Sequence, residues 1–592
     1  MKTSYHTLII GTGCAGYNAA DKLYELGVRD IAIITEGRYM GTSRNTGSDK
    51  QTYYKLSLCG SDGDSVREMA ETLYSGGGVM GEHALCEAAY STRCFMRLVE
   101  LGVPFPTNEY GEFAGYKTDH DPRTRATSCG PLTSKYMTEA LERSVINKGI
   151  EIIDSRRVIK ILTTDKAVSG VACLDTKTGD ISVISCQNAV LCTGGPAGIY
   201  KNTVYPESQH GATGLAIDAG ASLANMQEWQ YGIASTKFRW NLSGTYQQVL
   251  PRYVSVDKNG NEREFLYEGL GEKSLGLIFL KGYQWPFDVR KIDGSSTVDL
   301  LVAEEIKSGN RVYLDFTKNP KGLDSKFKNL PEVAYTYLEN SGALFGTPIE
   351  RLLKMNRGAV ELYLNNGIDL HRELLEIAVC AQHCNGGVAV DENWQSDVEG
   401  LYAAGEAAGT FGVYRPGGSA LNSTQVGSLR AAEHISKKTP VQKNTPSFAL
   451  PKIKFGESNI SKIRDEFQTR MSNAADFDRN VCAMKELFKD VSSLCDSFFE
   501  TAAIESPSEL NELYKLYDMI LTQRSVLSAM LLSAESVGTH GSAFVDRKPP
   551  KHTLAHKSRT VTSGADSREE PVSPMPTPEV WFETLLARAR QK

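Results

Sequence analysis

The sequence has 592 residues, 41% of them hydrophobic and 23% charged, with a net charge of −6 and a pI near 6.0. This length predicts several domains, or one large cofactor domain with insertions. The acidic balance argues against nucleic acid as a partner, because phosphate binding needs a basic surface. Twelve cysteines without a CxxC pair argue against a structural zinc site or an iron–sulfur cluster, so we expect no metal.

The same composition bears on localisation. No stretch approaches the roughly 20 apolar residues that span a bilayer, so we expect no intrinsic membrane segment. The run TLIIGTGCAG (7–16) is short and rich in glycine, and we interpret it as part of the fold rather than as a signal peptide. Singly spread cysteines suit a reducing compartment, so we expect a cytoplasmic protein.

The N-terminus carries a dinucleotide fingerprint. Residues 5–11 (YHTLIIG) predict a buried strand, a helix follows, and a second buried strand ends at Glu36. Gly11, Gly13 and Gly16 lie between the first strand and the helix, with the spacing GxGxxG. Gly11 permits a tight turn, Gly13 lets the backbone approach a pyrophosphate, and Gly16 lets the helix close onto the strand. We expect Glu36 to accept hydrogen bonds from ribose hydroxyls.

The strands that follow favour FAD over NAD. Residues 151–187 predict three or four strands joined by short turns, and a buried strand then runs into Thr193 and Gly194. Such a meander is foreign to simple NAD dehydrogenases and typical of two-dinucleotide-binding-type flavoproteins. VEGLYAAGEAAG (398–409) supplies a later strand that ends at Glu406. The predicted fold class is therefore α/β, with a discontinuous, Rossmann-like FAD domain.

Composition shifts divide the chain further. We expect FAD-binding segments at 1–229 and 351–437, an inserted α+β capping domain at 230–350, a linker at 438–455, a helical domain at 456–545 and a tail at 546–592. Amphipathic helices are predicted near 457–472, 476–500 and 508–536. The tail is rich in Pro, Ser, Thr and charge, which predicts an extended segment with a short terminal helix.

One arginine stands ahead of a predicted helix. In GVYRPGGSALN (412–422), Arg415 precedes Gly-Gly-Ser, and the helix would run on to residue 435. A guanidinium next to a helix N-terminus concentrates positive potential and unpaired N–H donors, which suits a negative or electron-rich group.

Taken together, IIGTGCAG, ITE, VLCTGG, LYAAGE and YRPGGSALN resemble the flavoprotein subunits of succinate dehydrogenase and fumarate reductase, a superfamily that includes L-aspartate oxidase. The likeness covers about residues 1–435, and more loosely 455–545. It implies hydride transfer between flavin N5 and a carbon of a small carboxylate substrate, which Arg415 would hold. It also implies that the backbone of Ala420 and Leu421 donates to the flavin pyrimidine. The cofactor-binding residues that it implies are Gly11, Gly13, Cys14, Ala15, Gly16, Glu36, Asn45, Thr46, Gly47, Val158, Thr193, Gly194, Glu406, Ala420 and Leu421.

Membrane succinate dehydrogenases attach FAD covalently through a histidine shortly after the second strand. The matching segment here, MGTSRNTGSDKQTYYK (40–55), contains no histidine. We therefore expect non-covalent FAD, with Asn45, Thr46 and Gly47 at its phosphates or ring edge and residues 48–50 reaching the redox face.

Three departures make this an atypical member and argue against fumarate as the substrate. Arg252 in LPRYVSVDKNG stands where the superfamily has its proton-relay arginine, but without the neighbouring glutamate and glycines. It has either a catalytic or substrate-contact role or a salt bridge in the cap. In CAQHCNGG (380–387), Gln382 occupies a substrate histidine's position and His383 follows one residue late. Either Gln382 donates to the substrate, or local geometry brings His383 in, or His383 is a satisfied core residue. A further histidine is missing from QYGIAST (230–236).

The cap segment also holds large and basic side chains. These side chains are Tyr231, Lys237, Arg239, Trp240 and Tyr246. They could bind a larger or aromatic acid as the substrate, or they could pack the core of the cap.

Electron flow is left open by the sequence. It has no second nucleotide fingerprint, no haem-attachment motif and no iron–sulfur cysteine set. Electrons would therefore come through a free reduced flavin, a bound partner protein or a second substrate. Of these we expect a ferredoxin-like partner on the helical domain, unless those amphipathic helices simply pack against the FAD domain. Two other functions stay open: an oxidase of the aspartate-oxidase kind, and a flavin-binding scaffold or sensor without turnover.

Overall fold

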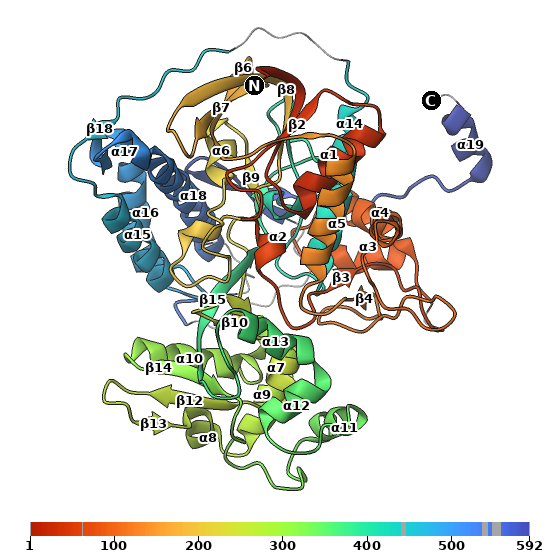
Figure 1. Cartoon of the computed structure of the whole chain (residues 1–592), viewed down its shortest axis with the longest axis vertical. Helices are drawn as coiled ribbons and strands as arrows, with labels where there is room; N and C mark the ends of the chain where they lie inside the picture. The colour runs from red at the N-terminus through yellow and green to blue at the C-terminus, as the bar shows by residue number, and fades with distance from the viewer. Residues whose placement is uncertain (1, 62, 440–445, 536–542, 548–557, 591–592) are drawn as a thin grey trace.

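The computed structural model describes residues 2–590 apart from 62, 440–445, 536–542 and 548–557. Residues 440–445 of the expected linker and part of the expected tail therefore lie outside the described residues. Figure 1 shows the predicted FAD domain in the upper half, the cap below it and the helical domain at one side. The predicted α/β fold class is confirmed.

The FAD domain is built on a seven-stranded sheet in the order β5-β2-β1-β8-β7-β6, with β17 also paired to β8. Its strands are β1 (Ser4–Ile10), β2 (Ile31–Ile34), β5 (Glu151–Ile153), β6 (Arg156–Thr164), β7 (Ala167–Asp175), β8 (Ile181–Leu191) and β17 (Leu401–Ala403). β1, β2, β5, β8 and β17 pair in parallel, while β6 and β7 form the antiparallel meander. The runs LIIG and IAII are almost wholly buried, as expected for parallel strands covered on both faces.

The FAD domain also contains the helices that pack beside this sheet and on one another. They are α1 (Cys14–Glu25), α3 (Val66–Tyr74), α4 (Gly81–Glu100), α5 (Thr133–Asn147), α6 (Thr213–Asp218) and α14 (Ser419–Ile435), and the short α2 (Thr42–Asn45) follows β2. α1 packs on α5 and α14. α14 begins directly after Gly418, which adopts the left-handed conformation at φ 91°. The helix predicted after Arg415 is therefore present at that place.

The cap is a six-stranded antiparallel sheet in the order β11-β10-β15-β14-β12-β13. Its strands are β10 (Trp229–Ser235), β11 (Trp240–Asn241), β12 (Arg252–Val256), β13 (Glu262–Arg263), β14 (Arg311–Asp315) and β15 (Leu375–Cys384). Its helices are α7 (Thr245–Gln248), α8 (Phe265–Leu270), α9 (Lys273–Tyr283), α10 (Ser296–Lys307), α11 (Glu332–Asn340), α12 (Pro348–Met355) and α13 (Arg357–Asn365). The cap therefore continues past residue 350, because β15 pairs with β10 on one side and β14 on the other.

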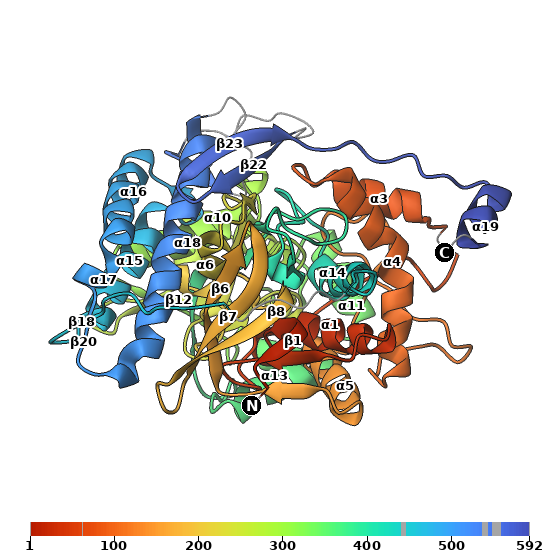
Figure 2. The ribbon, with the colours of Figure 1, turned by 90° about the horizontal axis from the view of Figure 1, so that it is seen from above.

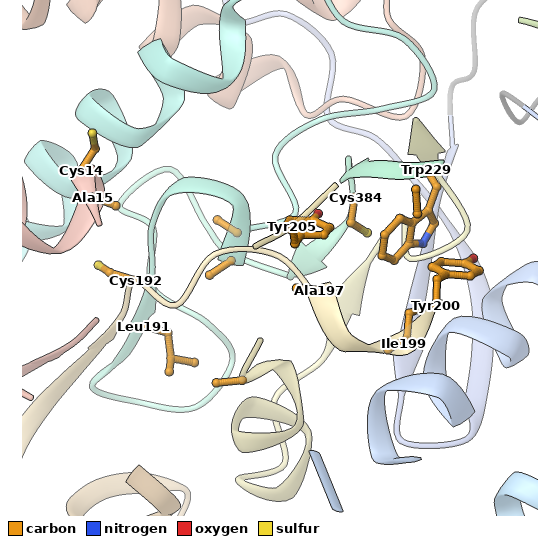
Figure 3. Packing of buried hydrophobic residues seen from close by; sticks show 14 of the residues in the cluster. Cys14, Ala15, Leu191, Cys192, Ala197, Ile199, Tyr200, Tyr205, Trp229 and Cys384 are labelled. Carbon is orange, nitrogen blue, oxygen red and sulfur yellow. The ribbon is translucent and has the colours of Figure 1, made fainter. Parts of the chain in front are cut away.

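The cap's large side chains serve packing. Tyr231 is buried beside Tyr200, and Tyr200 meets Trp229 edge to face with ring centroids 5.0 Å apart (Figure 3). The ring of Trp240 stacks on Phe238. These contacts favour the core-packing interpretation of the aromatic residues over an aromatic-substrate pocket.

The helical domain holds α15 (Ile460–Ala474), α16 (Val481–Asp496), α17 (Phe498–Thr501) and α18 (Leu510–Glu535), where the sequence predicts amphipathic helices. α18 packs on α6, and Gln523 Nε2 donates to the carbonyl oxygens of Ile199 and Phe467. α18 is thus part of the FAD domain's wall. No helix in the described part of the chain is both long and apolar enough to cross a bilayer.

The tail differs from the predicted extended segment. β22 (Ser558–Ser563) and β23 (Asp566–Pro571) form a hairpin that joins β9 (Leu223–Ala224) and β16 (Gly387–Val388) in a second sheet. The polar composition conceals these strands, because they form by pairing with other strands: β22 with β9 and β23 with β22. An extended arm then crosses towards α3 and α4 and ends in α19 (Phe582–Arg590), as Figure 2 shows.

Candidate active site

A cavity of about 230 Å³ lies at the carboxyl ends of β1, β2 and β8, and we call it the dinucleotide cavity. This edge of an open parallel sheet is where nucleotides bind in α/β folds. The residues predicted for cofactor binding that line it are Gly11, Gly13, Ala15, Glu36, Thr46, Val158, Thr193, Gly194, Glu406, Ala420 and Leu421.

The glycine turn has no room for side chains. Gly11 lies at φ 113°, and a Cβ there would collide with the Cys192 carbonyl at the end of β8. A Cβ on Gly16 would collide with the Gly11 carbonyl, so α1 closes onto β1 only because residue 16 is glycine. A Cβ on Gly13 would stand 3.2 Å from Ser43 Oγ. The backbone of this turn therefore carries no side chains where a pyrophosphate would lie. We call the turn the glycine cradle, and its geometry fits a dinucleotide.

Glu36 lies at the ribose end of this cradle and is already held by cations. Its Oε2 accepts from Arg157 Nη1 at 2.8 Å, and its Oε1 accepts from Lys515 Nζ at 2.8 Å and from Asn511 Nδ2 at 2.9 Å. Burial alone would raise the pKa of Glu36, but Arg157 and Lys515 outweigh burial and lower that pKa to about 2. Glu36 thus stays ionised and can accept from hydroxyls. No sequence pattern signals these partners, because α18 is remote in the chain.

Four predicted cofactor residues do not line the dinucleotide cavity. Gly16 acts through the close packing just described. Cys14 is buried in α1, with its Sγ 3.0 Å from Thr138 Oγ1. Asn45 Nδ2 donates to the carbonyl oxygens of Tyr39 and Gly41, which holds the α2 turn instead. Gly47 lines the second cavity described next.

A second cavity of about 300 Å³ lies between the FAD domain and the cap, and we call it the interdomain cavity. The cap contributes Asn241, Ser243, Gly244, Gln248, Gly282, Tyr283, Trp285 and Pro286. The FAD domain contributes Arg415 and the segments 46–52 and 116–120, which contain Lys50, Lys117 and His120. The two cavities share Thr46, Gln51, Gln382, His383, Ala420 and Leu421. They therefore adjoin where α14 begins.

Arg415 is only 8% exposed, and its guanidinium contacts neutral groups. Nη2 donates to Gln230 Oε1 at 2.7 Å, Nε donates to Asn385 Oδ1 at 3.3 Å, and Nη1 lies 3.5 Å from Ser419 Oγ. Burial lowers the pKa of Arg415 to about 10, so it stays cationic at neutral pH. Among the described residues, no carboxylate forms an ion pair with it.

The start of α14 is less open than the sequence predicts. The Leu421 N–H donates to the Gly418 carbonyl at 3.1 Å, so one of the two expected backbone donors is already engaged. Ala420 and Leu421 nevertheless line both cavities, at the positive end of the helix dipole.

Gln382 and His383 both reach the cavities, although successive strand residues normally point to opposite faces. A bulge explains this: His383 pairs with Gln230 and Ala381 with Tyr231, which leaves Gln382 without a partner. Burial first, and then the charge of Arg415, hold the pKa of His383 well below its usual range. His383 is therefore neutral at pH 7.

Arg252 is not among the residues that line either cavity. It lies on β12, next to the β13 edge of the cap sheet, where its guanidinium contacts Asp315 at 3.0 Å, Glu262 at 3.1 Å and Glu264 at 3.5 Å. The expected catalytic or substrate-contact role for Arg252 is not supported by this position. The alternative, a salt bridge within the cap, is the arrangement that the structure shows.

Two carboxyls, the buried Glu87 and the mostly buried Glu406, act on Arg415 through their charge. Glu406 Oε1 accepts from Tyr205 Oη and, at 3.0 Å, from the Cys384 N–H. Glu87 Oε1 accepts from Thr410 Oγ1 at 3.2 Å. Burial raises the pKa of each to about 7. Both carboxyls are therefore only partly ionised at neutral pH, and neither forms an ion pair with Arg415 among the described residues.

Glu87 predicts a pH dependence of stability. Its folded pKa of about 7 exceeds that of an exposed glutamate, so its contribution is complete at acidic pH and is lost as the pH rises towards 7. Relative to Glu87→Gln, the wild-type protein should therefore lose on the order of 1–3 kcal/mol between pH 5 and 8. Melting temperatures of both proteins across this range test the effect, with exposed Glu109→Gln as a control that should follow the wild type. Parallel curves for wild type and Glu87→Gln would contradict it.

Comparison with known proteins agrees with this geometry. The FAD binding domain family matches residues 6–421. A subunit of the fumarate reductase (CoM/CoB) of Methanothermobacter marburgensis is 26% identical over 556 residues, covering 90% of this chain and 93% of that protein. L-aspartate oxidase of Agrobacterium fabrum is 24% identical over 470 residues, covering 77% and 79%.

Solved structures show the same fold at lower identity. A mutant of E. coli quinol fumarate reductase superimposes with a TM-score of 0.73 at 18% identity, over 98% of both chains. Adenylylsulfate reductase from Archaeoglobus fulgidus gives a TM-score of 0.66 at 15% identity, over 98% of this chain and 97% of that one. The family match spans well over half of the sequence. The chain therefore belongs to the FAD binding domain family, within the fumarate reductase and succinate dehydrogenase flavoprotein superfamily.

Proposed function

We propose that this FAD-dependent oxidoreductase is a reductase or dehydrogenase that acts on a carbon–carbon bond of a small carboxylate other than fumarate, with its FAD held non-covalently. The observation that carries the proposal is Arg415. A buried cation without a carboxylate partner costs free energy, and an anionic ligand would offset that cost. The planar guanidinium fork suits a substrate carboxylate better than an ammonium group would, because it can donate two parallel hydrogen bonds.

The residues of the two cavities would have different roles in cofactor binding and substrate binding. The glycine turn and Glu36 would hold the dinucleotide, and bound FAD would supply the site that accepts or gives hydride, flavin N5. Arg415 would fix the acid in the adjoining interdomain cavity, and the cap would exclude water from it. The positive end of α14, between the cavities, would stabilise negative charge that develops there.

Because Arg252 lies outside the interdomain cavity, another group that lines this cavity would have to donate the proton to the substrate. His383 is neutral at pH 7 and cannot act there as an imidazolium donor. Lys50 and His120 are titratable groups of the lining. Burial lowers the pKa of His120, so this ring is also neutral at pH 7. Lys50 Nζ lies 5.4 Å from the Tyr116 ring centroid, and we assign Lys50 as the candidate proton donor.

Two substitutions argue against fumarate. Gln382 replaces a substrate histidine, and the segment 230–236 lacks another. A dicarboxylate needs two grips on its acid groups, and these are the positions that would supply the second one. Lys50 and Lys117 line the interdomain cavity together with Asp49 and Asp119, so its charges are mixed, and an acid with a hydrogen-bond donor would suit it as well as a second carboxylate.

An anaerobic acceptor screen tests the function. The protein is photoreduced under argon and then mixed with a panel of unsaturated acids, and we expect at least one to reoxidise the flavin faster than air does. Rapid peroxide formation from an amino or hydroxy acid would instead support an oxidase of the aspartate-oxidase kind. Reduced flavin that no organic acceptor reoxidises would support a scaffold or sensor.

The attachment of FAD has its own test. Among residues lining the dinucleotide cavity, the only histidine is His383, which contacts Asn385 rather than standing in segment 40–55. Precipitation with trichloroacetic acid should release all flavin into the supernatant. Yellow precipitated protein would contradict non-covalent binding.

Besides the acid in the interdomain cavity, a reductase needs an electron donor and a dehydrogenase needs an electron acceptor. We propose a ferredoxin-like partner that docks on α15 and α16, since α18 is committed to the FAD domain wall. The Methanothermobacter relative is itself named as one subunit of its enzyme, which supports a partner protein. Anaerobic reduction of the bound flavin by reduced ferredoxin, compared with free dithionite-reduced flavin, tests this assignment.

A further inference from the structure

Asn385 directly follows β15 and is completely buried. Its Nδ2 donates to the carbonyl oxygen of Gly412 at 2.7 Å, and the Val413 carbonyl lies at 3.4 Å. Carbonyl oxygens only accept hydrogen bonds, so the amide nitrogen must face the 412–413 loop. The amide oxygen, Oδ1, therefore faces the opposite way, towards the site.

Two side chains of the site meet at that oxygen. His383 Nδ1 lies 3.0 Å from Asn385 Oδ1, and Arg415 Nε donates to the same atom at 3.3 Å. An amide oxygen can only accept, so Nδ1 of the neutral His383 ring must carry the proton. Its Nε2 is then an acceptor.

The acceptor atom is buried and free. Among the described residues, His383 Nε2 has no hydrogen-bond partner, and Glu406 Oε1 stands 3.9 Å away. Leaving a buried acceptor unpaired costs free energy, so such an atom is suited to receive a donor. Any group that reaches Nε2 must bring an O–H or N–H.

We propose that Asn385 is a positioning residue: its amide oxygen fixes which ring nitrogen of His383 is protonated and orients the Arg415 guanidinium, so that an acceptor stands beside the cationic grip. The effect on substrate binding rests on the proposed function, whereas the protonation pattern of His383 does not. A neutral amide is suited to this task because it orients Arg415 without cancelling its charge. A carboxylate at this position would compete with the substrate.

Nitrogen NMR of the full, FAD-loaded chain tests the protonation pattern. The chain has ten histidines, so with ¹⁵N-labelled histidine the His383 signals are assigned by their loss in His383→Gln. We expect a protonated Nδ1 and an unprotonated Nε2 in the wild type. Asn385→Asp keeps the accepting oxygen and should keep this pattern, while Asn385→Leu should lose it. A protonated Nε2 in the wild type, or an unchanged pattern in Asn385→Leu, would overturn the proposal.

Asn225 offers a matched control. It is also a buried asparagine, and its Nδ2 donates to the carbonyl oxygens of Gly78 and Phe411 at 2.9 Å. Asn225→Asp removes comparable loop contacts but should leave the His383 pattern unchanged. If Asn225→Asp altered that pattern as Asn385→Leu does, the change would be caused by loss of contacts to the 411–413 loop. The proposal that Asn385 has a specific positioning role would then be wrong.

Steady-state kinetics provide the second readout. The substrate is the acid that reoxidises the photoreduced protein in the acceptor screen. Asn385→Leu and Asn385→Asp should each raise KM about tenfold or more with a smaller change in kcat, the first by freeing Arg415 and the second by neutralising it. Asn225→Asp should keep the wild-type KM. An unchanged KM in both Asn385 variants would overturn the Arg415 part of the proposal. If no acid is turned over, the proposed function fails, and the NMR result still decides the role of Asn385.

Discussion

Replacement of Arg415 by lysine is expected to reduce turnover about 10²–10³-fold while FAD remains bound, because an ammonium group cannot make the planar, two-point grip on a carboxylate. Arg415 does not line the dinucleotide cavity, so cofactor binding should be preserved. Anaerobic turnover and the flavin content of the purified variant are the two measurements. Both are needed, since loss of flavin alone would also abolish activity.

Arg252→Lys is the matched control for this prediction. Arg252 is held by Asp315, Glu262 and Glu264 within the cap, so the variant should keep turnover within about threefold of the wild type. Wild-type turnover in Arg415→Lys would remove Arg415 from the active site. A collapse of turnover in a stable, flavin-loaded Arg252→Lys would restore a catalytic role for the cap arginine.

Gly16→Ala is expected to weaken FAD binding about 10- to 100-fold. The added Cβ would meet the Gly11 carbonyl, a backbone atom that cannot rotate away, so the turn between β1 and α1 must shift. Overpacking of this kind costs about 1–3 kcal/mol, which corresponds to that loss when it displaces the binding turn. Titration of the apoprotein with FAD, followed by the quenching of flavin fluorescence, measures the affinity.

Gly269→Ala controls for the substitution itself. Gly269 lies in α8, its Cβ would meet open space, and alanine favours a helix more than glycine does. We expect wild-type FAD affinity and equal or higher stability in this variant. Wild-type affinity in Gly16→Ala would show that the close approach of α1 to β1 is unimportant for the cofactor.

Contiguous motifs account for the parts of the site that the sequence predicts well. Gly11, Gly13 and Gly16 lie within six consecutive residues between the end of β1 and the first turn of α1. Their spacing alone determines where the backbone carries no side chains. Thr193, Gly194 and Glu406 follow buried strands that end at the same edge of the sheet. In such segments the local backbone geometry and the residue order together place the atoms.

The sequence predicts the cap and the tail less well, and particular elements show why. β15 has no sequence signal that assigns it to the cap, because its apolar run suits either sheet. β22 and β23 are polar, and β22 pairs with β9, which is more than 300 residues away in the chain, while β23 pairs with β22. The bulge opposite Gln230 that brings both Gln382 and His383 to the cavities depends on the register with β10.

Residue order alone is enough to identify the cofactor, the fold of its domain and the helix that Arg415 precedes, because each of these depends on residues close together in the chain. The tertiary structure alone decides three sets of contacts: which of its two roles Arg252 has, the contacts of Arg157 and Lys515 with Glu36, and the place of Asn385 between His383 and Arg415. They depend on distances between remote segments, and such distances are set by the packing of whole elements rather than by any local pattern of residues.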